Sequence, residues 1–132
     1  CGLGGGCKID GGKPSEERLL LLQRETLELA LYTFRYTDAD NVVAIFPPTA
    51  DKKTHKFKKR QDLAVFMQRR DVEDQLHRPL GTTLTSTPPQ VSTIVQSPDI
   101  GSVQSLASPR SFNFKLLSGG TDGAYMVLQH IG

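Results

Sequence analysis

The first strong pattern along the chain is a stripe of apolar residues at helical spacing between residues 15 and 34. Residues three, four and seven positions apart share one face of an α-helix, so this stripe predicts an amphipathic helix. Pro14 suits a first helical turn, and Ser15 is a favourable N-cap ahead of two glutamates. The β-forming residues after Leu31 leave the end of the helix open. The stripe consists of Leu20, Leu27, Leu31 and Phe34, widened by Leu19, Leu22 and Ala30.

Two more apolar segments follow in the first part of the chain. Residues 38–41, which read Asp-Ala-Asp-Asn, predict a turn. The run from Val42 to Phe46 then indicates a buried strand that is stopped by Pro47 and Pro48. A second helix is predicted from Asp62, as its N-cap, to about His77. Its apolar residues are Leu63, Phe66, Met67 and Leu76, and Pro79 and Gly81 end it.

The C-terminal part has a different pattern. Residues 79–111 contain twelve Ser or Thr and five Pro. The segment is interpreted either as short strands separated by proline turns or as a loosely ordered linker. The strands of the first interpretation are Val91 to Val95, Ile100 to Leu106 and Phe112 to Leu117. Beyond residue 111, alternating apolar residues, a glycine-rich turn over 118–123 and the run from Tyr125 to Ile131 predict a terminal β-hairpin.

Together these segments predict an α+β fold, with two helices in the N-terminal half packed on a small, mostly antiparallel sheet that ends in a C-terminal β-hairpin. The chain has 132 residues, which suits one domain rather than two. Six of its twelve glycines lie in residues 1–12. Because glycine loses the most backbone entropy on ordering, this segment is expected to be a flexible tail, and residues 13–132 a single small domain.

Charge is unevenly distributed, although the net charge is only +2. Residues 1–50 carry a net charge of −2, residues 51–78 carry +4 and residues 79–132 carry none. The positive charge is concentrated in residues 52–60, a segment without an acidic residue. Such a density of like charge needs a counter-charge, from solvent ions, from acidic neighbours or from a polyanion. The candidate polyanion-binding residues are Lys52, Lys53, Lys56, Phe57, Lys58, Lys59 and Arg60.

The leading hypothesis is a non-enzymatic binding or assembly module that engages nucleic acid or another polyanion through residues 52–60. The lysines would contact phosphates, and Phe57 would stack on an exposed base. The competing interpretation is a solvated loop balanced by glutamates of the first helix, and the chain's pI of 8.6 is below the value above 9 typical of dedicated nucleic-acid domains.

The alternative function is a structural or protein-interaction subunit of a larger complex or particle. In that case the Leu-rich helix 15–34 and the unpaired edges of the hairpin would contact neighbouring chains, and the protein would form an oligomer. A small enzyme is a remote third alternative.

The sequence offers little to an enzyme or a metalloprotein. The glycine-rich start fails the phosphate-loop pattern, because Cys7 and Pro14 stand where Gly and Ser or Thr are required. Cys1 and Cys7 lack two further ligands at zinc-site spacing, and Asp38 with Asp40 lacks the Gly and Glu of a calcium loop. A serine elbow of the form Gly-x-Ser-x-Gly is absent from the sequence. No catalytic residue, metal or cofactor is therefore assigned.

The longest apolar runs are far shorter than the roughly 18–20 residues that a membrane-spanning helix needs. The chain is therefore expected to be soluble, with no membrane span. Its first residue is Cys1, followed by a glycine-rich segment, which leaves open a minor alternative in which a lipid on this cysteine anchors the chain to a membrane.

Overall fold

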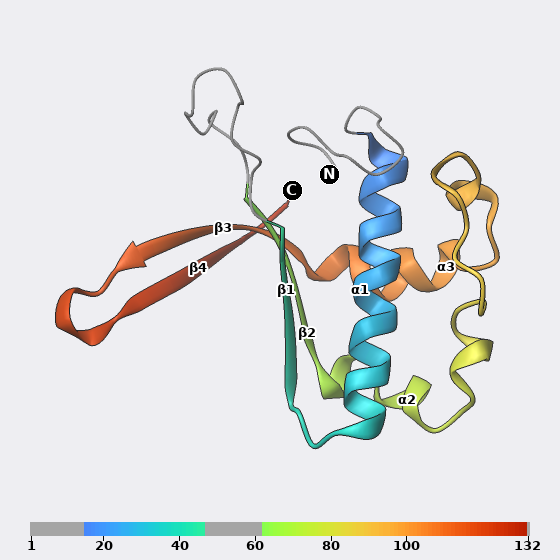
Figure 1. Cartoon of the computed structure of the whole chain (residues 1–132), viewed down its shortest axis with the longest axis horizontal. Helices are drawn as coiled ribbons and strands as arrows, with labels where there is room; N and C mark the ends of the chain where they lie inside the picture. Colours follow the sequence, from blue (N-terminus) through green and yellow to red (C-terminus); the bar gives the residue numbers. More distant parts are fainter. Residues whose placement is uncertain (1–14, 47–61, 132) are drawn as a thin grey trace.

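The computed structural model describes residues 15–46 and 62–131. It contains a long helix, α1 (Glu16–Tyr36), and four strands, β1 (Asn41–Phe46), β2 (Asp62–Gln68), β3 (Ser111–Ser118) and β4 (Ala124–His130). The strands form one antiparallel sheet in the order β1-β2-β3-β4. The predicted α+β class, with helices in the N-terminal half and a C-terminal hairpin, is confirmed (Figure 1).

The helix α1 begins where its sequence predicts. The side chain of the N-cap residue Ser15 accepts a hydrogen bond from the Arg18 N–H at 3.3 Å, which satisfies one of the free donors of the first turn. At the other end, the Arg69 guanidinium donates to the carbonyls of Phe34, Thr37 and Ala39 and lies over the Phe34 ring. These contacts satisfy carbonyls at the end of α1 and hold the loop that leads into β1.

The second predicted helix is wrong over most of its length. Residues 62–68 form the strand β2, and helix α2 covers only Glu73–Leu76, after a 3₁₀ turn at Arg69–Asp71. Leu63, Val65 and Met67 alternate along β2 and are buried. The strand pairs with β1 on one side and β3 on the other, so pairing and burial outweigh the weak helical pattern of these residues.

The strand β1 is confirmed in position but not in burial. Its residues alternate between exposed and half-buried, because β1 is an edge strand with one face on the core and the other open. Val43 and Ile45 are each 46% exposed on the open face.

Residues 80–110 pack as helical turns, so the first two strands proposed between the prolines are wrong. Buried Ile94, Val103 and Ala107 anchor these turns. The first of these turns lie on the side of α1 away from β1 and β2, and the later ones pass behind α1 to reach β3 (Figure 1). The third proposed strand, over residues 112–117, is confirmed as part of β3. The turns are Leu80–Thr82, Val91–Gln96, α3 (Ile100–Ser102), a π turn at Val103–Ala107, and Ser108–Arg110.

A buried ion-pair network fastens these turns to α1. The side chain of Arg24 is fully buried; its Nε donates to Asp99 Oδ2 at 2.9 Å and one Nη donates to the Thr85 carbonyl at 2.7 Å. Glu25 and Glu28 accept from its other Nη. Burial lowers the pKa of Arg24, but the hydrogen bonds and charges of these carboxylates outweigh burial and raise it overall. Arg24 therefore stays charged, and a buried charge with this many partners fixes one arrangement of the segment.

A second polar link lies near the root of the hairpin. Gln23 donates from Nε2 to the Ser111 hydroxyl at 2.8 Å and accepts from the Ser108 hydroxyl at 2.9 Å. Among the described residues, no buried side-chain polar atom lacks a hydrogen-bond partner. The polar groups that α1 buries are thus satisfied, as a stable core requires.

Candidate protein-interaction surface

The hairpin formed by β3 and β4 extends beyond the rest of the sheet. Strand β2 pairs with β3 only over Ser111–Phe114, so residues 115–127 have no β2 partner. These residues, here named the hairpin arm, project away from α1 and from the helical turns (Figure 1). The arm therefore lies outside the packed body of the described structure.

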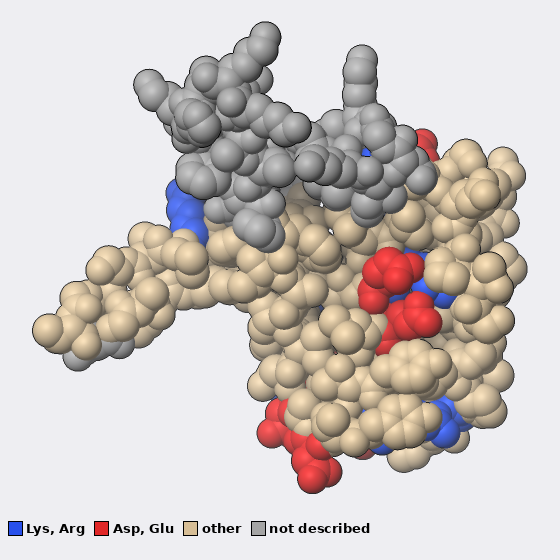
Figure 2. All heavy atoms as spheres, in the orientation of Figure 1, with Lys and Arg blue, Asp and Glu red and all other residues tan. Residues whose placement is uncertain are grey.

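The arm exposes apolar side chains on both of its faces. Leu116 is 65% exposed on one face, and Leu117, Tyr125 and Val127 are 52%, 56% and 47% exposed on the other. Its sequence carries two charged residues, Lys115 in β3 and Asp122 in the turn. In the space-filling view the coloured part of the arm is tan except for one basic side chain near its base, whereas acidic side chains gather on the body (Figure 2). Exposed apolar residues grouped in this way are typical of an interaction surface.

The turn of the arm depends on two glycines with positive φ. Gly120 has φ of 66° and Gly123 has φ of 101°. The Gly119 N–H donates to the Gly123 carbonyl at 2.6 Å, which closes the turn beside the last strand pair, Ser118 with Ala124. The predicted hairpin and its glycine-rich turn are thus confirmed.

The outer edge of β4 is open along its whole length in the described part of the chain. Gly119 and Gly123 form a hydrogen-bonded pair, and the pairing of β3 with β4 continues without a bulge to Phe112 and His130. Hydrogen-bonded and non-hydrogen-bonded pairs alternate in an antiparallel ladder. The odd-numbered residues of β4 therefore bond to β3, whereas the even-numbered residues direct their N–H and C=O groups outward, namely Ala124, Met126, Leu128 and His130.

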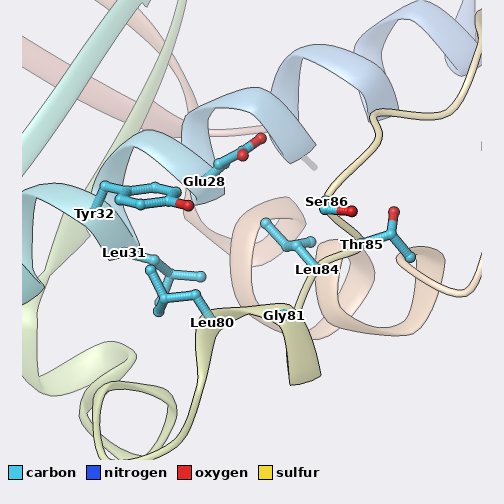
Figure 3. Close-up of a pocket in the computed structure, with 8 residues that line it drawn as sticks. All are labelled: Glu28, Leu31, Tyr32, Leu80, Gly81, Leu84, Thr85 and Ser86. Atoms are coloured by element: carbon cyan, nitrogen blue, oxygen red, sulfur yellow. The ribbon is translucent and has the colours of Figure 1, made fainter.

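The body contains a small pocket of about 90 Å³ between α1 and residues 80–86 (Figure 3). Leu31, Leu80 and Leu84 form its apolar wall, and Glu28 and Tyr32 contribute polar atoms. The Glu28 carboxylate is already bonded to Arg24. The Thr85 hydroxyl donates toward Asp99 and the Thr87 carbonyl. Glu28 and Thr85 at this pocket thus belong to the network that fastens residues 80–110 to α1.

The hairpin contains a hydroxyl and an imidazole, those of Thr121 and His130, that the fold does not bring together. Thr121 lies at the turn and His130 at the far end of the hairpin, opposite Phe112, so they are not neighbours across the strands. In residues 15–46 and 62–131, no group of three or more His, Cys, Asp or Glu side chains is arranged to hold a metal ion. Within the same ranges, no helix is long and apolar enough to cross a membrane.

The residues proposed for polyanion binding, Lys52 to Arg60, lie outside the described residues, as do Cys1 and Cys7. The residues that flank the basic segment are described: Phe46 at the end of β1 pairs with Leu63 at the start of β2. The connection between these strands therefore leaves and re-enters the sheet at one end.

The Leu-rich helix, proposed as a partner surface, buries most of its apolar face within the chain. Leu27, Ala30, Leu31 and Phe34 are at most 1% exposed, in one core with Val65 and Met67. The arm is a better candidate surface. The sequence signal for the arm was the pair of largely apolar strands around residues 118–123, with Lys115 as their one charged residue. Their sequence does not show that pairing with β2 stops at Phe114.

Comparisons of the chain with protein-family models, curated proteins and solved structures gave no match.

Proposed function

We propose that the protein is a non-enzymatic assembly subunit that binds another protein chain through the hairpin arm. The observation that carries this proposal is the exposure of apolar side chains on both faces of the arm, with Leu116 and Tyr125 more than half exposed. A two-stranded hairpin standing alone is marginally stable in water. A partner that covers the arm would stabilise it by removing this apolar surface from solvent.

The open edge of β4 supports strand addition as the mode of binding. Four residues of β4 direct backbone donors and acceptors outward, and an extended segment of a partner would satisfy them. The side chains beside this edge are uncharged. The partner segment is therefore expected to be an uncharged strand with alternating apolar side chains, because a buried unpaired charge would oppose binding.

Site-specific photo-crosslinking tests this proposal. A photoreactive phenylalanine analogue, p-benzoylphenylalanine, replaces Tyr125 on the arm or, as a matched control, Tyr36 at the end of α1; these side chains are 56% and 72% exposed. In cells that express the protein, position 125 is expected to give covalent adducts of defined mass that position 36 does not give. Equal labelling from both positions, or no adduct from position 125, would show that the arm is not an interface.

A second candidate function is polyanion binding by residues 52–60. Its support is the charge of this segment, together with the pairing of Phe46 with Leu63, which brings both ends of the connection to one place on the sheet. Several lysines attached at one place can contact neighbouring phosphates of one polyanion. The two functions are compatible, since the arm and the basic segment are different parts of the chain.

A further inference from the structure

The proposed function leaves open which protein covers the arm, and the sequence of β4 bears on that question. From Ala124 to His130 it reads Ala-Tyr-Met-Val-Leu-Gln-His, with no Asp, Glu, Lys, Arg or Pro. Edge strands of proteins that stay monomeric are usually protected by charged residues, proline or a bulge. The described edge of β4 has none of these, so it is open to pairing with a strand like itself.

The geometry of β4 fits an antiparallel pair with its own copy. A two-fold axis perpendicular to the sheet pairs even-numbered residues with even-numbered ones and odd-numbered residues with odd-numbered ones. A register centred on Val127 therefore pairs all seven residues of the strand with those of the second copy. In this register Met126 lies opposite Leu128 of the partner subunit. Both residues direct their N–H and C=O groups outward, so they would form a hydrogen-bonded pair.

The side chains in this register are also compatible. Val127 meets the partner's Val127 across the axis, at a non-hydrogen-bonded position where side chains approach most closely. Met126 and the partner's Leu128 are apolar, and Tyr125 lies opposite Gln129 of the partner subunit. No like charges face each other along the strand.

The other open edges are poorer candidates. The free edge of β3 covers only residues 115–118 and includes Lys115, whose charge would oppose that of a second copy. The edge of β1 is also uncharged, but β1 packs on the body through Val42 and Phe46, whereas the hairpin projects from the body and leaves β4 room for a second copy (Figure 1). We infer that two copies of this chain associate through antiparallel pairing of β4, centred on Val127, to form one continuous eight-stranded sheet. This inference rests on the proposed function, with a second copy as the partner.

Charge substitutions at the axis test the inference. We expect the purified protein to have twice the 14.5 kDa mass of one chain in light scattering after size exclusion, and to dissociate on dilution. Val127→Lys and Val127→Glu each place like charges opposite each other and should weaken the dimer at least about tenfold. An equimolar mixture of the two variants should dimerise again, because Lys then faces Glu.

Two matched variants control for charge and for folding. Val43→Lys and Val43→Glu change a valine of nearly equal exposure on the other edge strand, β1, and should leave the dimer intact. Position 127 lies opposite Lys115 on β3, so Val127→Glu keeps the hairpin favourable and is the primary test, whereas Val127→Lys places two lysines opposite each other within one chain. Circular dichroism of each variant checks that the fold is retained.

The outcomes separate this inference from the proposed function. A wild-type protein that stays monomeric at every concentration, or a dimer disrupted at Val43 but not at Val127, overturns self-pairing. If the monomer still gives adducts of another mass from position 125, the arm binds a different protein and the proposed function stands. If position 125 gives no adduct, the proposed function fails as well.

Discussion

Asp71 shows at the level of one residue how the sheet is joined to the helical turns. Its Oδ2 atom accepts the Gln68 N–H at 2.8 Å and lies 3.0 Å from Arg110 Nε. Partial burial raises the pKa of Asp71, but these hydrogen bonds and the charge of Arg110 outweigh burial and lower it overall. The carboxylate thus links the end of β2 to the turn that precedes β3.

The lowered pKa of Asp71 predicts a pH-dependent contribution to stability. The unfolded chain, with an ordinary Asp pKa of about 3.9, binds a proton more readily than the folded protein. The contribution is therefore complete well above pH 4 and is lost as pH falls through the lower, folded pKa. Asp71→Asn should reduce the free energy of unfolding by about 1 kcal/mol at pH 7, and its difference from wild type should shrink toward pH 2.

Urea unfolding at several pH values measures this difference. Asp38→Asn, which changes an exposed carboxylate in the loop before β1, serves as the control and should follow the wild-type curve. A constant gap between Asp71→Asn and wild type across the acid range would contradict the proposed role of ionised Asp71.

Residue roles were predictable where their partners are local. Ser15 was expected to cap α1 because an N-cap bonds within the next three residues. Arg24, by contrast, is paired with Asp99, 75 residues away, and helical spacing does not indicate that its side chain would be buried. Long-range ion pairs of this kind depend on packing that the local sequence does not encode.

At the level of elements, β2 and the hairpin differ in how much local sequence says about them. The hairpin was predicted because its turn glycines and alternating strands are adjacent in sequence. For β2, Leu63, Phe66 and Met67 fit a helical stripe as well as a strand, and an Asp at the start resembles an N-cap. Its neighbour β3 begins more than forty residues later. The pairing that favours a strand over a helix at these residues therefore cannot be predicted from the local sequence.

The turn of the arm yields a prediction about two glycines. An added Cβ at Gly120 or Gly123 meets no atom within 4 Å, so backbone conformation alone decides the cost of substitution. Gly123 has φ of 101° and ψ of −146°, close to a region that is essentially restricted to glycine, and Gly123→Ala should destabilise the hairpin by about 1–3 kcal/mol. Gly120 has φ of 66°, a left-handed conformation that asparagine tolerates, so Gly120→Asn should change stability by less than about 1 kcal/mol.

Hydrogen exchange of the backbone amides distinguishes the two glycine variants. Gly123→Ala should speed exchange in residues 115–130 and leave α1 unchanged, because the arm lies outside the core. Gly120→Asn should exchange like wild type. Equal effects of the two variants, or faster exchange throughout the molecule, would show that the arm does not open independently of the body.

At the scale of the whole molecule, the fold class could be predicted because it needs only the order of helical and strand patterns. The packing of residues 80–110 against α1 could not be predicted in this way. Residues 80–110 were interpreted as strands or linker because their prolines and hydroxyl side chains are typical of loops, yet buried Ile94 and Val103 hold them against α1. The buried ion pair of Arg24 with Asp99 fixes the position of this segment beside α1. The composition of the segment does not indicate that this ion pair forms.

The uneven charge of the chain gives the last prediction. If residues 52–60 bind polyanions, affinity for a single-stranded oligonucleotide should fall steeply with salt, with a slope that reports the number of phosphates neutralised. The triple variant with Lys56, Lys58 and Lys59 changed to Gln should reduce that slope by up to about 2. Fluorescence anisotropy of a labelled oligonucleotide from about 50 mM salt upward provides the measurement.

Arg70, Arg78 and Lys115 provide the matched control, since they are exposed basic residues of the described part of the chain. Changing these three to Gln removes the same charge from elsewhere and should leave most of the slope in place. If the two triple variants lose the same slope, attraction comes from net charge and not from residues 52–60. If wild type does not bind at low salt, the polyanion hypothesis is wrong and the positive charge of this segment is balanced by solvent ions or acidic neighbours, while the role proposed for the arm is unaffected.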